Sequence, residues 1–376
     1  MKKILSVMIS VMFISVFSIC TVSAVQADVS AKGFVLIEEK TGEIIYEKDP
    51  FEKLPMASTT KIMTALLCLE SGGLDDEFVV DPEAIKVEGS SMGLKEGDIV
   101  TKRALCCGML LPSGNDAANA AAVRISGSIP EFVKLMNKKA EEIGLTRTHF
   151  VTPSGLEGEG HGSSAYDMAL LAREALKEPE FCNICSQSSM KVRFGSPPYD
   201  RWLKNTNKLL TMYDGVKGVK TGFTDEAGRC LVSACERDGV TLICVTLNDR
   251  NDWNDHMKMY DEGFSAVRTK KLSCKESFEV PVMGGQKDKV AVSAQKDVVI
   301  GSDGRNDKNI HSDILLPPFV YPDIKCGDKI GELRWYCGER LIESVDINAL
   351  EDVGYKSNDN EDISLWEKIK KAVFNS

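Results

Sequence analysis

The chain contains 376 residues, of which 43% are hydrophobic, and it carries a formal net charge of −10. This length allows two domains, each with a core of its own. The acidic balance argues against a nucleic acid as partner, because phosphate groups bind to basic surfaces. The four histidines lie far apart in the sequence, so we expect no metal site, and no motif points to a cofactor.

The first residues have the pattern of an export signal. Two lysines precede a mostly apolar run over residues 4–20, and the small residues that follow offer cleavage after Ala24 or Ala27. An uncleaved anchor helix is the alternative, but the run is short and is interrupted by serines. We therefore predict a signal peptide over residues 1–27 and a protein exported from the cytoplasm.

The chain contains 12 cysteines, which in an exported protein would ordinarily indicate disulfides. Loss of the signal leaves an odd number. Several cysteines, such as Cys68, Cys106 and Cys244, fall within apolar periodic segments, where a thiol behaves as a small hydrophobe. Cys182 and Cys185 form a lone CxxC motif, which is weak evidence for redox or metal chemistry. We expect mostly free, buried thiols.

The first predicted element of the mature chain is a β-hairpin over residues 33–48, with its turn at Thr41-Gly42. Helical periodicity follows, and from Gly215 the period changes to two, with a hairpin signal at Asp238-Gly239. These patterns indicate an α/β domain over residues 28–272, with a mixed or antiparallel sheet. The predicted helices cover residues 57–69, 102–111, a segment that starts at Asp116, 130–143, 165–177 and 253–267.

The remainder of the chain has a different residue pattern from the first domain. Short alternating strands with glycine-rich turns predict a small all-β domain over residues 273–352, a β-sandwich. An acidic linker over residues 353–362 leads to the segment 363–376. Written as a helix, this last segment has an apolar face that includes Trp366 and a polar face with lysines, which predicts reversible binding to an anionic membrane surface. Docking of the segment on its own β domain is the alternative.

Three short motifs could carry chemistry, and the first is Ser58-x-x-Lys61. On a helix, residues three apart share one face. A buried lysine with a lowered pKa could then take the proton of the serine hydroxyl, which would make the serine a nucleophile. Ser-x-x-Lys also occurs by chance in many helices, and a solvated lysine is the alternative.

The second motif is Ser113-x-Asn115, between two predicted helices. Pro112 and Gly114 make a rigid turn that can direct the hydroxyl and the amide toward a cleft. The alternative is a helix N-cap, formed by Asn115 or Asp116.

The third motif is Lys220-Thr221-Gly222, on a predicted strand. The lysine and the threonine hydroxyl together suit a carboxylate, and Gly222 allows a close approach by a ligand or another backbone. An edge-strand lysine that discourages aggregation is the alternative.

In this order and spacing, the three motifs resemble those of the penicillin-recognising serine enzymes. The segments "GSSMGLKEGD", "HGSSAYDMALLA" and "DGVKGVKTGFTDEAG" make the sequence most similar to low-molecular-mass penicillin-binding proteins that act as D-alanyl-D-alanine carboxypeptidases. The resemblance covers nearly the whole chain. It implies a β-lactamase/transpeptidase-like domain, with an antiparallel sheet and a helical cluster, followed by the all-β domain and the C-terminal helix.

The resemblance also implies roles for individual residues. Ser58 would form an acyl-enzyme with Lys61 as its general base, and its backbone N–H would share the oxyanion hole with that of Phe223. Ser113 would pass a proton toward the leaving amine, and Asn115 would hold the substrate amide.

The third motif would anchor the substrate. Lys220 and Thr221 would bind the terminal carboxylate of a peptidoglycan stem peptide ending in D-Ala-D-Ala, or the carboxylate of an inhibitory β-lactam. Some relatives carry histidine in place of Ser154 and Phe223, so any accessory role of those positions does not transfer. Arg250 is a further candidate for carboxylate binding.

Three other functions are compatible with parts of this sequence pattern. A class A β-lactamase would need a deacylating glutamate, and no Glu-x-x-x-Asn element lies between Asn115 and Lys220. The sequence also leaves open an endopeptidase that cuts peptide cross-links and a catalytically inactive wall-binding protein. The favoured interpretation is a carboxypeptidase at the extracytoplasmic face of the bacterial cytoplasmic membrane, in contact with the cell wall.

Overall fold

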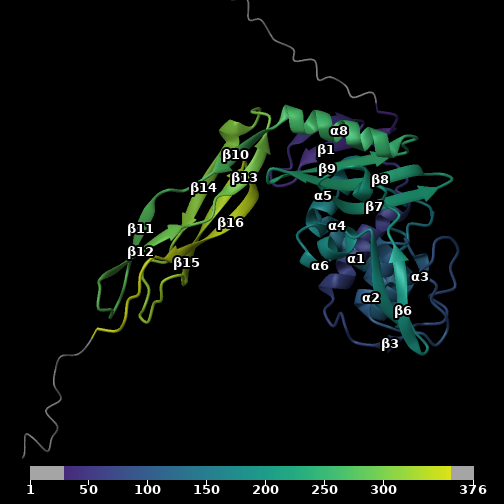
Figure 1. Ribbon diagram of the computed structural model, residues 1–376, viewed down its shortest axis with the longest axis horizontal. Helices are drawn as coiled ribbons and strands as arrows, with labels where there is room; N and C mark the ends of the chain where they lie inside the picture. Colours follow the sequence, from purple (N-terminus) through teal and green to yellow (C-terminus); the bar gives the residue numbers. More distant parts are fainter. Residues whose placement is uncertain (1–28, 357–376) are drawn as a thin grey trace, which may run out of the picture.

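The computed structural model describes residues 29–356. The predicted signal peptide over residues 1–27 and the predicted amphipathic helix over residues 363–376 lie outside the described residues. Two parts are visible in Figure 1: an N-terminal α/β domain and an elongated β domain.

The N-terminal domain is built on a five-stranded antiparallel sheet with the strand order β2-β1-β9-β8-β7. The early hairpin and the late meander, both predicted from the sequence, are therefore joined by the pairing of β1 with β9. The strands are β1 (Gly33–Glu38), β2 (Ile44–Lys48), β7 (Val216–Thr224), β8 (Gly228–Arg237) and β9 (Val240–Leu247).

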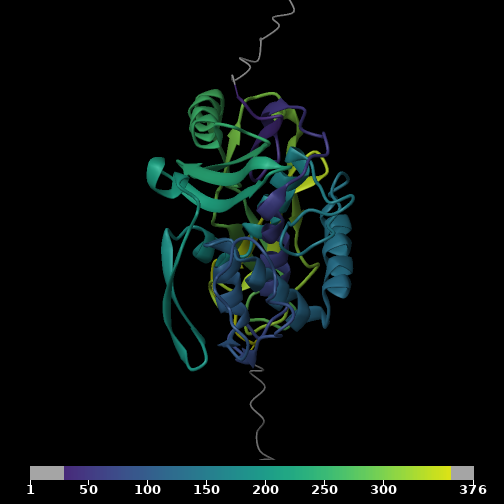
Figure 2. The ribbon, with the colours of Figure 1, turned by 90° about the vertical axis from the view of Figure 1, so that its right-hand side faces the viewer.

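Helix α8 packs on one face of this sheet, and the other long helices lie on the opposite face (Figures 1 and 2). Serine and threonine side chains cap three of the helices: Thr101, Ser128 and Ser164 each accept a hydrogen bond from a backbone N–H in the first turn. The helical elements are η1 (Ala57–Thr60), α1 (Lys61–Glu70), α2 (Lys102–Leu110), α3 (Asn115–Ser126), α4 (Ile129–Ile143), α5 (Ala165–Ala175), α6 (Pro179–Cys185), α7 (Leu209–Met212) and α8 (Asp252–Ala266).

A long hairpin, which the sequence patterns did not predict, projects from this domain (Figure 2). It consists of β5 (Ser189–Gly195) and β6 (Pro198–Lys204), and it is extended into a small sheet by the two-residue strands β3 (Phe78–Val79) and β4 (Ile99–Val100). Most of its side chains are exposed or half-buried. Its apolar alternation is weak for that reason.

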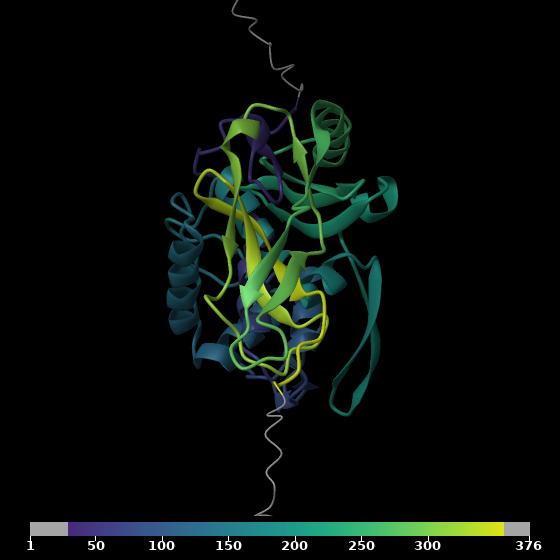
Figure 3. The same ribbon diagram turned by 90° about the vertical axis from the view of Figure 1, so that its left-hand side faces the viewer.

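The β domain contains a two-stranded and a five-stranded sheet around a core of valine, isoleucine and leucine side chains. This domain faces the viewer in Figure 3. The small sheet pairs β10 (Arg268–Leu272) with β13 (Val298–Ser302). β10 thus precedes the boundary expected at residue 273. The larger sheet has the order β11-β12-β16-β15-β14, and its strands are β11 (Ser277–Pro281), β12 (Lys289–Ala294), β14 (Ile310–Leu315), β15 (Lys329–Cys337) and β16 (Arg340–Ala349); the short helix η2 (Asp307–Asn309) precedes β14.

The two domains meet at the β1–β2 turn. The Arg340 guanidinium donates to the carbonyl oxygen of Thr41 at 3.1 Å, and the Arg305 guanidinium donates to that of Ile44 at 2.6 Å. Lys40 forms an ion pair with Glu343 at 2.9 Å. Polar and charged contacts therefore hold one end of the β domain against the N-terminal domain.

The thiols are as expected from the sequence. All eleven cysteines between residues 29 and 356 are free, and most are buried. In the same range, no helix is long and apolar enough to cross a bilayer.

Candidate active site

Ser58 lies in η1, the single turn that leads directly into α1. The preceding residue, Ala57, has a φ of 47°, a left-handed conformation that is unusual for a residue with a side chain. Lys61, one turn later, is fully buried. The predicted pairing is present, since Lys61 Nζ lies 2.9 Å from Ser58 Oγ.

The amine of Lys61 is held by two further oxygen atoms, Asn115 Oδ1 at 2.7 Å and the Ser154 carbonyl at 2.6 Å. Both can only accept, so the amine must donate an N–H to each. A neutral amine has two N–H groups and one lone pair. Its lone pair would then face the hydroxyl of Ser58, as a general base requires.

Electrostatics favour this neutral form. Burial lowers the pKa of Lys61 well below its usual value, and the nearby Lys220 amine lowers it further. A solvated lysine, the alternative considered from the sequence, is therefore wrong.

The second motif lies where α3 begins. Ser113 is buried with a φ of 66°, and it lines the cavity described below. Asn115 is the first residue of α3 and does not cap it; its Nδ2 group donates to the Glu88 carbonyl at 2.7 Å while its Oδ1 accepts from Lys61. The N-cap alternative is therefore wrong, because the Asn115 amide is engaged with other segments.

Asp116 has a positioning role that the sequence analysis missed. Its carboxylate accepts hydrogen bonds from the backbone N–H groups of Met92, Gly93 and Leu94 and from the Ser91 hydroxyl. These contacts fix the loop that brings Ser90 to the cavity. Nothing in the local sequence distinguishes this role from that of a helix cap.

The segment that carries Ser154 is tied to the helix of the nucleophile. Thr64 Oγ1 donates to the Pro153 carbonyl at 2.6 Å. At Gly155, whose φ is 85°, a Cβ atom would come within 2.0 Å of the Ala57 carbonyl oxygen. His161 Nδ1 accepts from the Val151 N–H at 3.0 Å, and burial lowers its pKa to about 4. The neutral His161 thus helps to hold this loop.

The third motif lies on β7, at the edge of the sheet next to η1. A Cβ atom at Gly222 would lie 3.1 Å from Met56 O, Ser58 N and Thr59 N, so glycine allows the strand to approach the nucleophile. Lys220 is almost completely buried, which lowers its pKa to about 7. The aggregation-blocking surface lysine considered from the sequence is therefore wrong.

These elements surround a cavity of about 290 Å³. Four of its lining residues belong to the three sequence motifs, namely Ser58, Ser113, Thr221 and Gly222, and a fifth, Phe223, was assigned to the oxyanion hole from the resemblance. The other five, which the sequence did not reveal, are Ser90, Thr206, Arg229, Asp252 and Trp253.

Arg229, at the start of β8, supplies a cation to this cavity. Its guanidinium donates to the buried Asp252 carboxylate at 2.6 Å and lies 5.4 Å from the ring centroid of Trp253. Its Nε atom is buried without a partner in the described chain. Arg250, the candidate taken from the sequence, is exposed and does not line the cavity.

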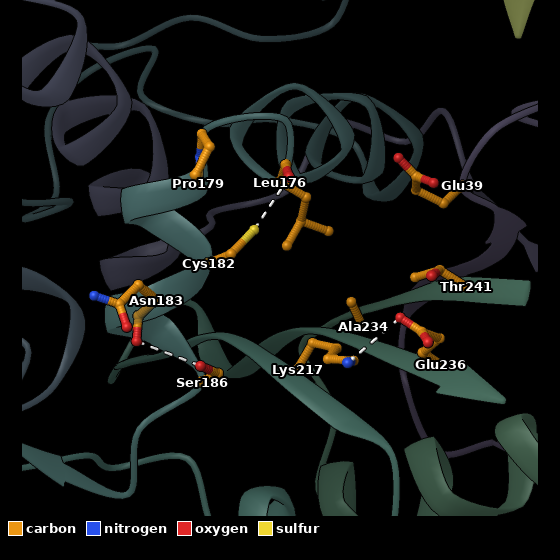
Figure 4. A pocket seen from close by; sticks show the side chains of 10 residues that line it. All are labelled: Glu39, Leu176, Pro179, Cys182, Asn183, Ser186, Lys217, Ala234, Glu236 and Thr241. Carbon is orange, nitrogen blue, oxygen red and sulfur yellow. Dashed lines mark hydrogen bonds and ion pairs between the residues drawn. The ribbon is translucent and has the colours of Figure 1, made fainter. Parts of the chain in front are cut away.

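A second hollow, of about 430 Å³, lies between α6 and the start of β7 (Figure 4). Lys217 and Glu236 form an ion pair there at 3.4 Å, and the Cys182 thiol donates to the Leu176 carbonyl at 3.1 Å. Burial raises the pKa of Cys182, which makes its thiol a poor nucleophile. Across residues 29–356 no cluster of acidic, histidine or cysteine side chains could hold a metal ion.

Two family models match the chain. Residues 20–251 match the family described as D-alanyl-D-alanine carboxypeptidase, and residues 268–355 match the family described as penicillin-binding protein 5, C-terminal domain. The chain is 34% identical over 356 residues to the D-alanyl-D-alanine carboxypeptidase DacF of Bacillus subtilis, in a match that covers 90% of this chain and 91% of that one.

Two further comparisons concern structure and a related activity. The crystal structure of penicillin binding protein 5 from Haemophilus influenzae superposes with a TM-score of 0.62 at 28% identity, covering 87% of this chain and 98% of that one. A D-alanyl-D-alanine endopeptidase of Pseudomonas aeruginosa is 30% identical over 225 residues, covering 58% of this chain and 72% of that one.

Proposed function

The chain belongs to the D-alanyl-D-alanine carboxypeptidase family, and from this membership we propose that Ser58 is the nucleophile of a serine carboxypeptidase acting on peptidoglycan stem peptides. The observation that carries the assignment is the position of Lys61 Nζ, 2.9 Å from Ser58 Oγ and bonded to two oxygen atoms that can only accept.

The first chemical step forms the acyl-enzyme. Lys61 takes the proton of the Ser58 hydroxyl as Oγ attacks the carbonyl carbon of the penultimate D-alanine. The backbone N–H groups of Ser58 and Phe223 stabilise the oxyanion that forms. The close packing of Gly222 against η1 supports this pairing, because it brings the two backbone segments together.

The second step releases the terminal D-alanine. The C–N bond breaks as Ser113 delivers a proton, taken from Lys61, to the leaving nitrogen. Water then attacks the ester, with Lys61 again as base, and frees Ser58. Asn115 holds the Lys61 amine throughout. The second N–H of the Asn115 side chain can then donate to the substrate amide.

Three groups bind the terminal carboxylate in this proposal: the Lys220 amine, the Thr221 hydroxyl and the Arg229 guanidinium. Thr221 Oγ1 lies 2.7 Å from Thr206 Oγ1, within hydrogen-bond distance. A bound carboxylate raises the pKa of Lys220 from about 7 and so restores its positive charge. Arg229 therefore has the carboxylate-binding role for which Arg250 was the candidate from the sequence.

The competing activities have less support. The endopeptidase match covers 58% of this chain, whereas DacF matches 90% of it. For the β-lactamase alternative, no glutamate is among the cavity-lining residues of the described chain. We therefore expect a long-lived penicillin acyl-enzyme, and rapid turnover of nitrocefin would revive the β-lactamase alternative.

The proposed location is the extracytoplasmic face of the membrane, reached through the export signal and held by the segment 363–376. A protein shortened after Asp362 should lose affinity for anionic vesicles and keep its activity on soluble peptide. Equal vesicle binding by the full and shortened chains would contradict attachment through this segment.

A direct assay tests the proposed activity. The mature protein is incubated with a pentapeptide ending in D-Ala-D-Ala, and the products are separated by mass. We expect free D-alanine and a tetrapeptide, and neither product with Ser58→Ala. Cleavage of cross-linked dimers without release of D-alanine would instead favour an endopeptidase.

A further inference from the structure

Large apolar side chains gather at one end of the β domain. Met283, Phe319, Tyr321 and Tyr355 are 53%, 39%, 68% and 68% exposed. They come from three separate segments: the β11–β12 turn, the β14–β15 connection and the residues after β16. We refer to these four residues as the distal tip.

Backbone hydrogen bonds hold the distal tip together. The N–H of Met283 donates to the Val320 carbonyl at 2.9 Å, and the N–H of Lys356 donates to the Gly284 carbonyl at 3.0 Å. The Phe319 and Tyr321 rings meet edge to face, with their centroids 5.5 Å apart. These contacts join the segments that carry the exposed rings and hold the rings in place.

The segments that carry the distal tip, which include the β11–β12 turn, lie at the end of the β domain away from the N-terminal domain (Figure 1). β14 and β15 run between the domain contact and the tip: Ile310 pairs with Cys337 near the contact, and Leu315 pairs with Glu332 toward the tip. Tyr355 is also the last residue but one before the segment 357–376, which includes the predicted membrane-binding residues 363–376.

The chemistry of the tip suits the boundary between lipid and water. Tyrosine is enriched there because its ring is apolar and its hydroxyl is polar. Lys356 is exposed beside Tyr355, and a lysine can keep its ammonium at the headgroups while its carbon chain lies along apolar surface. Lys325 is also exposed, but its ammonium forms an ion pair with Asp323 at 2.8 Å. Large exposed apolar patches on a protein often mark interaction sites.

We propose that the distal tip contacts the surface of a phospholipid bilayer directly, as a second attachment point beside the C-terminal segment. Two contacts on one rigid domain would restrict its tilt and set the direction in which the catalytic domain faces. The proposal is independent of the active-site assignments, since none of the tip residues lines the catalytic cavity.

Cys326 offers a native position for a probe. It is exposed and lies in the β14–β15 connection, which also carries Phe319 and Tyr321. Its backbone N–H donates to the Asp352 carboxylate at 2.7 Å. The full mature chain is labelled at Cys326 with an environment-sensitive fluorophore and titrated with vesicles of phosphatidylglycerol and phosphatidylcholine. We expect a blue shift of the emission on binding. A label at Tyr199→Cys in a Cys326→Ser chain, on the β5–β6 hairpin, should show none.

A matched pair of variants measures the contribution to binding. Phe319→Ser with Tyr321→Ser should weaken vesicle partitioning of the full chain about tenfold, because apolar ring surface no longer leaves water. Tyr199→Ser with Trp202→Ser removes two exposed rings from the β5–β6 hairpin and should change nothing. Carboxypeptidase activity on soluble peptide should be equal in all three proteins.

Two outcomes would overturn the proposal. Unchanged partitioning by the tip variant together with an unshifted probe would leave attachment to the C-terminal segment alone. A tip variant that loses self-association in sedimentation, with the same vesicle affinity, would assign the patch to a second copy of this chain.

Discussion

Two lysine amines, those of Lys61 and Lys220, are buried in one site. Burial lowers the pKa of both, to about 7 for Lys220, so the site is arranged to hold at least one amine without its proton near neutral pH. Below the lowered pKa of Lys61 the base is protonated, and the rate of acylation should fall as the pH decreases.

Replacement of Lys61 by arginine tests its role as base. Arginine keeps the positive charge but cannot lose its proton near neutral pH. Acylation by penicillin should fall roughly 100-fold or more, the range lost with a general base. Lys217→Arg, on the same strand as Lys220 but in the other hollow, is the control. An arginine variant of Lys61 that acylates at the normal rate would show that another group takes the proton.

Arg229 is expected to recognise the carboxylate of the substrate. Arg229→Gln should reduce the rate constant for acylation by benzylpenicillin about tenfold, since a hydrogen bond to a charged group is lost. The methyl ester of benzylpenicillin, which lacks this charge, should react equally with both proteins. Arg250→Gln serves as the matched control; if it is the variant that discriminates acid from ester, the assignment to Arg229 is wrong.

The sequence was informative about side chains in motifs and uninformative about groups that only folding brings together. Ser58 and Lys61 were predicted as partners because a spacing of three residues on a helix determines their proximity. The Ser154 carbonyl belongs to the backbone, so its contact with Lys61 could not be predicted from the type of residue at this position. Arg229 reaches the cavity from a neighbouring strand, and its sequence position gives no sign of this.

At the level of elements, the decisive contact is between β7 and η1. Gly222 is the residue that permits it, since a side chain there would meet three backbone atoms of the nucleophile's turn at 3.1 Å. In the proposed oxyanion hole, this close approach of β7 to η1 brings the backbone N–H groups of Phe223 and Ser58 together.

Gly222→Ala should therefore impair acylation. The methyl group would push β7 away from η1, and loss of one oxyanion donor typically costs about 100-fold in rate. Intact-protein mass spectrometry over a time course of penicillin exposure gives the rate. Gly354→Ala, where the nearest atom belongs to a side chain 3.5 Å away, is the control. Normal acylation by Gly222→Ala would contradict the proposed pairing of the two backbone segments.

The elements themselves were largely predictable. The helices and the final meander follow from clear periodicity, as at α4 and α8, where one face is buried. The β5–β6 hairpin was missed because it packs little surface against a core. Ser113 and Ala57 adopt left-handed conformations that no residue pattern indicated.

For the whole molecule, the domain contact contains a carboxyl group that responds to pH. Burial raises the pKa of Glu43 to about 7, and the neighbouring Asp303 of the β domain adds to the rise. Asn306 donates to Glu43 Oε1 at 3.1 Å, and the Arg305 guanidinium lies 3.9 Å from it. Deprotonation near neutral pH would place two carboxylates against each other at the contact.

The consequence is that the stability contributed by Glu43 falls with rising pH. The folded protein binds a proton at Glu43 that the unfolded chain, with a pKa near 4.5, has already lost, so this contribution should be lost as the pH rises from about 4.5 to about 7. Over this range the melting temperature of the unmodified protein should therefore fall relative to that of Glu43→Gln, whereas Glu47→Gln, exposed on the adjoining strand β2, should follow the unmodified protein. Parallel curves for Glu43→Gln and the unmodified protein would exclude this role.

Formation of an acyl-enzyme on Ser58, with Lys61 as base, is the step on which the proposed activity depends. Peptide-mapping mass spectrometry after exposure to benzylpenicillin locates the covalent adduct directly. We predict one adduct, on the peptide containing Ser58, and its absence from Ser58→Ala. An adduct on any other residue, or an unlabelled protein that still releases D-alanine, would contradict this mechanism.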